Sequence, residues 1–205
     1  MQLVEIDTEP APLTFLVTGV PGAGKTTVSR ELARRFLRAA HIAADALGTM
    51  ILAGRVPPRA PSEDASPGAE AEYEGDRQLL LRARNASLLC DSFCRAGFTP
   101  ILDDVIVRKL QLDFYMRHLR SRPVVLVVLA PRREVILARE PGRAAHRRGL
   151  VEEWLFLEDS LRSDLAGVGL WIDTSAQTPR QSADAILDAV GEAARDRSSA
   201  GRIHW

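Results

Sequence analysis

Residues 19–26 read GVPGAGKT, and this stretch decides the fold. It matches the pattern G-x-x-x-x-G-K-[ST] and lies between an apolar, β-rich run at 13–18 and a segment with apolar residues at helical spacing from Thr26 onward. In such a strand–turn–helix unit the glycines let backbone N–H groups converge at the helix N-terminus, where the helix dipole adds positive charge. A P-loop of this kind binds an anion, so the sequence predicts a site for a nucleoside triphosphate.

The positions of the P-loop have separate expected roles. Lys25 is expected to reach the β- and γ-phosphates as a catalytic residue, and the hydroxyl of Thr26 is expected to bind Mg²⁺. We expect ATP as the nucleotide, and the preference between adenine and guanine stays open, although the chain has no guanine-reading N-K-x-D motif. The residues expected to contact the nucleotide are Gly19, Gly22, Ala23, Gly24, Lys25, Thr26, Thr27, Arg139 and Ser175.

Strand-like and helix-like segments alternate along the rest of the chain. The expected strands are 13–18, 41–44, 99–105, 124–130 and 169–173, and the expected helices are 26–40, 47–52, 76–96, 110–119, 132–139, 151–165 and 182–194. This alternation predicts an α/β fold with a parallel five-stranded sheet covered by helices on both faces. We expect a single domain over 1–205, with tails at 1–12 and 196–205 and a long loop at 55–75.

Composition narrows the class of protein. The 205 residues are 46% hydrophobic and 26% charged, as in a globular chain, and the longest apolar run, at 124–130, is far shorter than the ~20 residues that a membrane helix needs. The 27 basic and 27 acidic residues balance, which argues against nucleic acid or a membrane surface as a partner. The N-terminus lacks a signal-like pattern, so we expect a cytoplasmic protein, a monomer or a homodimer. Cys90 and Cys94 are expected to be small buried residues without a disulfide.

Three aspartates follow predicted strands. Asp103 and Asp104 end the third strand, beside the expected P-loop, where a carboxylate can hold Mg²⁺ directly or through water. Because side chains alternate along a strand, the two should point to opposite sides, and one is expected only to cap the next turn. Asp45 follows the second strand, where it could accept the proton of an acceptor hydroxyl or could cap a helix, and the residues alone leave both interpretations open.

Arginines after the fourth predicted strand indicate a lid. Arg139, Arg143, Arg147 and Arg148 all fall within 139–149. Guanidinium groups on such a segment can clamp a triphosphate and stabilise the charge of the transferring phosphoryl group. Arg139 and Arg143 are the expected catalytic members of this group.

The turn after the last predicted strand, IDTSAQTP at 172–179, has two interpretations. Ser175 could contact the nucleotide where this turn passes beneath the base, or the turn could do no more than cap a helix at Thr178. The four histidines have no metal-ligand spacing, and we assign them no role.

Several separated segments together resemble the chloramphenicol phosphotransferase-like branch of small P-loop kinases, which is related to shikimate, gluconate and adenylylsulfate kinases. The resemblance extends from residue 13 to about 190. The segments that carry it are the P-loop, AADALGTMI at 43–51, RAGFTPILDDV at 95–105, VLVVLAPRREVILARE at 125–140 and IDTS at 172–175.

The resemblance implies a P-loop kinase fold and an ATP-dependent transfer of the γ-phosphoryl group to a hydroxyl of a small molecule. It also implies Asp45 as the base for that hydroxyl, Asp103 and Asp104 as the acids that attend the metal, and Arg139 with Arg143 as lid residues. The lid sequence GRAAHRRG departs from the family's arginine-glycine-aspartate-arginine pattern, so the register of its later arginines stays open.

The identity of the acceptor does not transfer with the resemblance, because the 55–75 loop differs in composition from the family's acceptor segment. We expect the acceptor to contact this loop, the segment after Asp45 and the start of the 110–119 helix, with Tyr73, Arg108 or Tyr115. An antibiotic or nucleoside-like natural product is the expected acceptor, with resistance as the biological role. The alternatives are a nucleotide, shikimate-like or sugar kinase of metabolism, and a regulator or toxin-like NTPase with a macromolecular acceptor.

Overall fold

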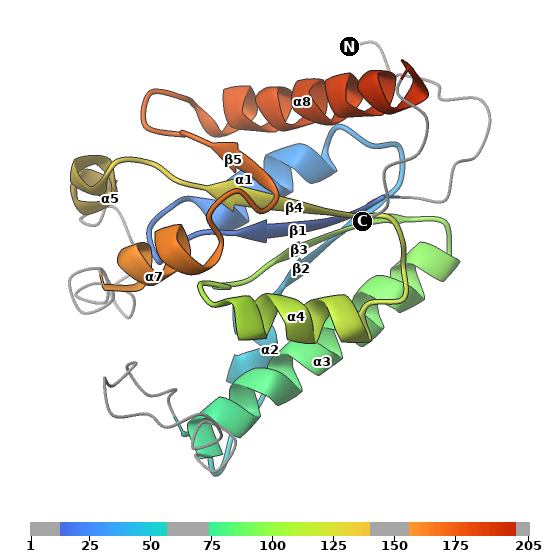
Figure 1. The fold of residues 1–205 in the computed structure, drawn as a ribbon. Helices are drawn as coiled ribbons and strands as arrows, with labels where there is room; N and C mark the ends of the chain where they lie inside the picture. Colours follow the sequence, from blue (N-terminus) through green and yellow to red (C-terminus); the bar gives the residue numbers. More distant parts are fainter. Residues whose placement is uncertain (1–12, 57–73, 140–155, 200–205) are drawn as a thin grey trace.

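A computed structural model describes residues 13–56, 74–139 and 156–199 of the chain. Its centre is a sheet of five parallel strands in the order β2-β3-β1-β4-β5 (Figure 1). The prediction of an α/β fold with a five-stranded parallel sheet is therefore confirmed. The strands are β1 (Thr14–Thr18), β2 (Ala39–Ala43), β3 (Thr99–Asp103), β4 (Val124–Leu129) and β5 (Leu170–Ile172).

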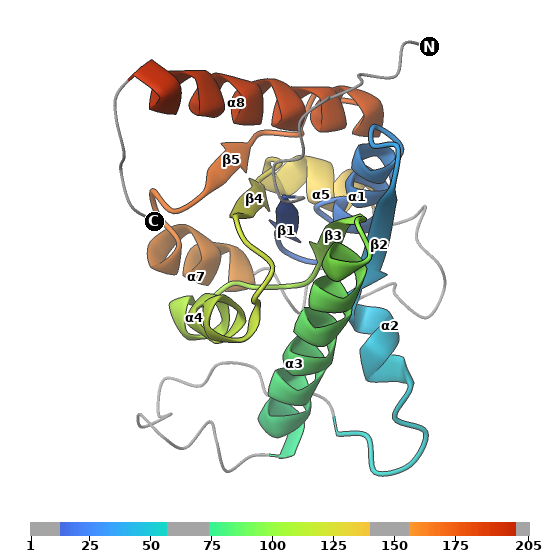
Figure 2. The same cartoon turned by 90° about the vertical axis from the view of Figure 1, so that its right-hand side faces the viewer.

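Helices cover both faces of this sheet. Figures 1 and 2 show α1 and α8 on one face and α3 and α4 on the other. The shorter α2 directly follows β2, and α5 and α7 lie at the end of the sheet toward which β1 points (Figure 1). The helices are α1 (Lys25–Ala33), α2 (Ala44–Thr49), α3 (Glu74–Arg95), α4 (Lys109–His118), α5 (Arg133–Arg139), α7 (Phe156–Asp164) and α8 (Pro179–Ser199).

The central strands are buried on both faces, which is why they read as continuous apolar runs in the sequence. Phe15, Leu16 and Val17 of β1 have no exposed surface, and neither do Ile101 and Leu102 of β3. Each such side chain contributes roughly 1.5–3 kcal/mol of hydrophobic stabilisation. The P-loop therefore starts from the most buried strand of the sheet, which gives it a rigid base.

The first helix is shorter than predicted. The apolar spacing extends to Ala40, but α1 ends at Ala33, and Ala39 and Ala40 pair with β3 as the start of β2. Phe36, which continues the helical spacing, instead packs its ring against Phe15 with centroids 5.7 Å apart. Pairing with the sheet outweighs helical periodicity here, because the chain has to turn before it can align with β3.

The end of α3 agrees with the prediction. Gly97 follows the helix with φ +76°, and the N–H of Phe98 donates to the Phe93 carbonyl at 3.0 Å, which closes the last turn. Cys90, on the same helix, is buried, and burial raises the pKa of its thiol to about 12. Both cysteines are free thiols, as predicted, although Cys94 is only partly buried.

The last helix begins earlier than predicted, at Pro179 rather than residue 182. Thr178 caps it as expected: its hydroxyl accepts from the Gln181 N–H at 3.2 Å, and the Gln181 amide oxygen accepts from the Thr178 N–H at 2.9 Å. Proline fits the first helical position, because that N–H has no partner within a helix. The helix runs to Ser199, into the segment expected to be a tail from residue 196.

Within 13–56, 74–139 and 156–199, no helix combines the length and the apolar character that a membrane span requires. Residues 1–12, 57–73, 140–155 and 200–205 lie outside the described part of the chain. The predictions that fall there concern both tails, most of the 55–75 loop with Tyr73, the start of the 151–165 helix, and the lid beyond Arg139 with Arg143, Arg147 and Arg148.

Candidate active site

The carboxyl ends of three neighbouring strands bring the predicted site residues to one edge of the sheet. In the strand register, Val17 of β1, Asp103 of β3 and Ala43 of β2 lie side by side. The P-loop begins two residues beyond Val17, and Asp45 lies two residues beyond Ala43. In open α/β sheets, ligands bind in the crevice outside these strand ends.

Three glycines of the P-loop, Gly19, Gly22 and Gly24, have a positive φ, which is the backbone region that favours glycine. Gly19 has φ +149°, and a Cβ atom there would lie 2.6 Å from the Leu129 carbonyl oxygen at the end of β4. Gly24, at the N-cap of α1, has φ +95°. Ala23 between them is buried, and its N–H donates to the Val20 carbonyl at 3.1 Å. The loop is thus folded tightly against the sheet, as a phosphate-binding turn requires.

Lys25 and Thr26 are the P-loop side chains that are expected to contact phosphate and Mg²⁺. Lys25 is buried, and its Nζ donates to the carbonyls of Gly19 at 2.9 Å and Val20 at 3.1 Å. The cation therefore lies over the loop to which the phosphates are predicted to bind. Thr26 Oγ1 lies 3.3 Å from Asp103 Oδ1, whereas the neighbouring Thr27 is exposed.

Asp103 connects the P-loop to a histidine on β2. Its Oδ2 lies 2.5 Å from His41 Nε2, while its Oδ1 faces the Thr26 hydroxyl, and the carboxylate itself is buried. His41 is a residue that sequence analysis left without a role. Only the strand register places it beside Asp103, so no local pattern could have identified it.

The residues around Thr26 fit a magnesium ion that is held jointly with phosphates. Thr26 and Asp103 supply a hydroxyl and a carboxylate, which are hard oxygen ligands. Among the described residues there is no group of three or more His, Cys, Asp or Glu side chains that could hold a metal. Mg²⁺ is commonly bound by one or two carboxylates together with substrate phosphates and water, so this donor set is suited to it.

Asp104 points to the other side of β3 and has different partners. Its Oδ1 accepts from Arg82 Nη2 at 2.5 Å and from the Val105 N–H at 2.8 Å, and its Oδ2 accepts from the Tyr115 hydroxyl at 2.6 Å. The two aspartates thus face opposite sides, as alternation along a strand requires. The structure places Asp103 beside Thr26 and directs Asp104 elsewhere, so the expectation of a metal role for Asp104 finds no geometric support.

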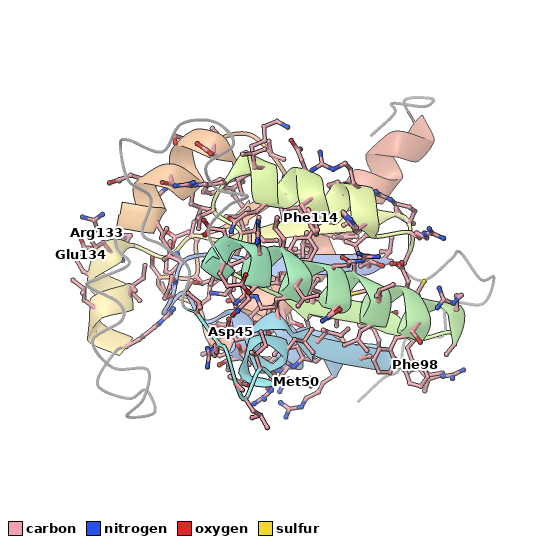
Figure 3. All side chains as sticks on the ribbon, turned by 90° about the horizontal axis from the view of Figure 1, so that it is seen from below. Asp45, Met50, Phe98, Phe114, Arg133 and Glu134 are labelled. Atoms are coloured by element: carbon pink, nitrogen blue, oxygen red, sulfur yellow. The ribbon has the colours of Figure 1, made fainter. Side chains whose placement is uncertain are left out.

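Asp45 lies in the first turn of α2, at the junction with α3 (Figure 3). Its Oδ1 accepts from Arg82 Nη1 at 3.2 Å, and its side chain is 51% exposed. Ala43 is the N-cap of α2, without a side-chain cap, so the interpretation of Asp45 as a helix cap is wrong. A half-exposed carboxylate at this edge of the sheet is suited to meeting an acceptor hydroxyl.

The surroundings of Arg82 and Tyr115 determine the protonation state of each side chain. Burial alone lowers the pKa of Arg82, but the charges of Asp104 and Asp45 outweigh burial and raise it above its usual value. Burial, together with the charge and hydrogen bond of Asp104, raises the pKa of Tyr115 well above its usual value. Arg82 is therefore a cation between two carboxylates, and Tyr115 is a neutral hydrogen-bond donor.

Arg139 contacts the P-loop from α5, whereas Asp45 and Asp103 belong to the side of β2 and β3. It ends α5, and its guanidinium donates to the Thr174 carbonyl at 2.8 Å and to the Ala23 carbonyl at 3.5 Å. It thus joins the P-loop to the turn after β5. In that turn, the N–H and hydroxyl of Ser175 bond to Asp173 and lower the pKa of the Asp173 carboxyl, and Ser175 Oγ also accepts from the Arg132 N–H at 2.8 Å.

The two helices that flank the predicted lid are joined through one buried acid. Glu158 of α7 lies 3.3 Å from the guanidinium of Arg133 on α5 and 2.9 Å from that of Arg162. Figure 3 shows Arg133 on α5. The helices on either side of 140–155 are therefore linked by an ion pair.

Sequence analysis missed Arg82 as well as His41, and it named Tyr115 only as a candidate for the acceptor wall. Arg82 lies beside the buried positions Ala83 and Ala86 of α3, at the margin of the stripe that faces the sheet. This position beside an apolar stripe is the only feature of the sequence that indicates a partly buried arginine. Because arginine is frequent throughout the chain, this signal does not single it out.

The model of a family described as AAA domain matches residues 15–155 of the chain. No curated protein sequence matches the chain. The matched range includes the P-loop, β2 to β4, all of β1 except Thr14, and the residues around Asp103 and Arg82.

Solved structures with the same fold include several kinases. A sugar kinase from Janibacter sp. HTCC2649 has a TM-score of 0.60 and 20% identity, and the match covers 89% of this chain and 95% of that one. The tunicamycin resistance protein of Deinococcus radiodurans has a TM-score of 0.57 and 20% identity, with 89% and 96% covered. Shikimate kinase from Acinetobacter baumannii has a TM-score of 0.56 and 22% identity, with 90% and 95% covered. The chain is therefore similar in fold to P-loop kinases.

Proposed function

The chain belongs to the AAA domain family, and on this premise we propose that it is an ATP-dependent kinase of small molecules. One observation carries the proposal: a P-loop with its lysine and a half-exposed aspartate lie at the same edge of the sheet, on either side of β3. The P-loop accounts for the phosphoryl donor, and Asp45 accounts for the acceptor.

The nucleotide site uses backbone amides of the P-loop and the ammonium group of Lys25. On binding, Lys25 Nζ would exchange its carbonyl partners at Gly19 and Val20 for phosphate oxygens, because a charged acceptor forms the stronger hydrogen bond. Thr26 and Asp103 would hold Mg²⁺, which supplies positive charge to the β- and γ-phosphates when it is bound. Arg139, at 3.5 Å from the Ala23 carbonyl, is close enough to the loop to contact the same phosphates.

The transfer step requires a base for the acceptor hydroxyl. Asp45 would accept that proton while the hydroxyl oxygen forms a bond to the γ-phosphorus and the bond from this phosphorus to the bridging oxygen of ADP breaks. Oδ1 of Asp45 is held by Arg82, and no described residue bonds to its Oδ2, which leaves that oxygen for the proton. Arg139, with Arg143 of the lid, would stabilise the negative charge on the transferring group.

The acceptor proposed first is an antibiotic or nucleoside-like natural product, with resistance as the role, in a cytoplasmic enzyme of the chloramphenicol phosphotransferase-like kind. The segments that resemble that branch support this choice, as does the tunicamycin resistance protein among the similar structures. A sugar or shikimate-like metabolite is the second candidate, because a sugar kinase and a shikimate kinase have the same fold.

Mass spectrometry of reactions with Mg·ATP and a library of hydroxylated antibiotics, nucleosides and sugars tests the proposal. We expect one class of compound to gain a single phosphate, and we expect Lys25→Ala and Asp45→Asn to lose the product. Asp45→Asn should lower kcat by roughly 10²–10⁴-fold with little change in the KM for ATP. Asp188→Asn, which removes an exposed carboxylate on α8, is the matched control and should behave as the wild type.

Two results would count against this function. If the protein binds ATP and no compound in the library gains phosphate, a small-molecule acceptor is the wrong class, and protein and RNA acceptors come next. If Asp45→Asn turns over at the wild-type rate, Asp45 is not the base.

A further inference from the structure

Asp104, on the side of β3 that faces α3 and α4, is held in place by several hydrogen bonds. Its side chain is buried, and it accepts from the Val105 N–H and from the hydroxyl of Tyr115, which is itself 1% exposed. These partners come from the chain just after β3 and from α4. A side-chain cation that pairs with Asp104 is therefore anchored to the sheet and to α4.

Arg82 reaches from Asp104 to α2. One terminal nitrogen of its guanidinium donates to Asp104 at 2.5 Å and the other donates to Asp45 at 3.2 Å. The aliphatic part of Arg82 passes close to α2, since a Cβ atom at Gly48 would lie 3.5 Å from Arg82 Cδ. Arg82 Nε is buried and has no hydrogen-bond partner among the described residues. The guanidinium is thus enclosed, with both outer nitrogens committed to carboxylates.

Asp45 needs such a partner, because its own helix does not hold it. The helix α2 has six residues and begins without a side-chain cap, and the Asp45 side chain is half exposed. Isolated helices of this length are unstable in water. Among the described residues, Arg82 alone forms a hydrogen bond and ion pair with the Asp45 carboxylate, so Arg82 determines where the carboxylate points.

We propose that Arg82 is the positioning residue that holds the Asp45 carboxylate toward the acceptor, with Asp104 and Tyr115 as its anchor. This inference rests on the proposed function as far as the acceptor is concerned. Arg82 acts through Asp45, since both terminal nitrogens of its guanidinium already contact carboxylates and its side chain is only 15% exposed. Lysine could not replace it, because a single ammonium group cannot form the two contacts of a planar fork to carboxylates on separate elements.

The first experiment needs no acceptor. Hydrogen–deuterium exchange of the full chain is compared for the wild type, Arg82→Gln, Arg82→Lys and Arg84→Gln, the last of which removes an exposed arginine two residues further along α3. We expect faster exchange at the amides of residues 44–49 in both Arg82 variants and no change there in Arg84→Gln. The P-loop amides should exchange at the wild-type rate in all four proteins. Unchanged exchange at 44–49 in both Arg82 variants overturns the proposal.

The second experiment measures kcat and KM for ATP on the acceptor found for the wild type. A carboxylate displaced by about an ångström can cost roughly 10²-fold in rate, so Arg82→Gln should lower kcat by about that factor while the KM for ATP stays within about twofold. Arg82→Lys should show a similar loss, and added guanidinium ion should restore part of kcat to Arg82→Ala. A merely structural role would instead raise the KM for ATP and lower kcat together, without rescue, and would overturn the proposal.

Failure of the proposed function gives a different result. In that case the wild type phosphorylates no small molecule, whereas the exchange experiment still decides whether Arg82 holds α2 and its carboxylate. Should Arg82→Gln not fold, Arg82→Lys preserves the charge on α3 and decides the same question.

Discussion

Asp103 and Asp104 are neighbours in the chain, yet their surroundings differ in kind. Asp103 faces α1 and lies between Thr26 and His41, so its partners are a hydroxyl and an imidazole. Asp104 faces α3 and α4, and both of its oxygens accept from a guanidinium, a phenol or a backbone N–H. Both oxygens of Asp104 accept from donors at short range, whereas Oδ1 of Asp103 faces the Thr26 hydroxyl, at 3.3 Å. Strand alternation thus gives two adjacent residues different surroundings, and on this difference we base different expected roles.

The largest expected effect comes from removing the saturated acid. Asp104→Ala leaves the Arg82 cation and the Tyr115 hydroxyl buried without their common partner, and loss of one member of a buried ion pair costs about 3–5 kcal/mol. Urea unfolding of the variant should show a decrease in the free energy of unfolding of this size. The control is Asp113→Ala, which removes the partner of Lys109 on the surface of α4 and should cost less than about 1 kcal/mol. Equal losses in the two variants would contradict the contrast between the aspartates.

The next effect concerns the magnesium requirement. Asp103→Asn keeps a side-chain oxygen near Thr26 but removes its charge, so we expect the Mg²⁺ concentration for half-maximal activity to rise by roughly 10²-fold. The free energy of unfolding should fall less than in Asp104→Ala, because no buried cation loses its partner. Kinetic titration with Mg²⁺ and urea unfolding measure the two quantities, and a chelator should abolish activity in the wild type. A larger stability loss in Asp103→Asn than in Asp104→Ala would reverse the comparison.

A substitution of His41 tests the predicted magnesium role of Asp103 from its other side. Because this histidine contacts Asp103 and not the predicted ligand position of Thr26, His41→Asn should raise the Mg²⁺ requirement by roughly tenfold, less than Asp103→Asn. The same shift with His118→Asn, whose ring stacks on Phe114 of α4, would show that the effect is not local to Asp103.

The smallest effect comes from Tyr115→Phe, which removes one hydrogen bond to Asp104 and should lower the free energy of unfolding by about 1.5 kcal/mol near neutral pH. The pKa of Tyr115 is raised in the folded protein, so the contribution of this group is complete below its unfolded value near 10 and declines as the pH rises above that value. Unfolding experiments above pH 10 should therefore show a steeper loss of stability in the wild type than in Tyr115→Phe. Cys90, with its pKa raised to about 12, contributes equally to both proteins from pH 9 upward. Parallel pH profiles would show that the phenol does not remain protonated at Asp104.

Those parts of the site that depend on local pattern could be predicted from the sequence. The P-loop is a continuous motif between a strand and a helix, and Asp103 is a candidate because it lies at a strand end. For Asp45 the residues alone leave a helix cap open, and the resemblance to small P-loop kinases makes it the expected base. Arg82 and His41 could not be identified in this way, since their roles depend on which strand pairs with which and on how α3 turns against the sheet. The predicted end of the first helix, at residue 40, was wrong for the same reason. The helical pattern continues to Ala40, but α1 ends at Ala33 because the chain then pairs with β3 as β2.

The position of β2 and β3 as neighbours has a consequence for how proteins of this fold can diversify. The chain leaves the sheet at Ala43 and returns to the adjacent strand at Thr99, and everything between these points, including α2 and α3, forms one continuous excursion. Because β2 and β3 run parallel, the excursion starts at the carboxyl edge of the sheet, where Ala43 pairs with Asp103, and returns at the opposite edge, where Thr99 pairs with Ala39. Its length could change between these two points without moving β1, the P-loop or β4. If the proposed function holds, the acceptor side of the site could therefore vary while the P-loop stays in place.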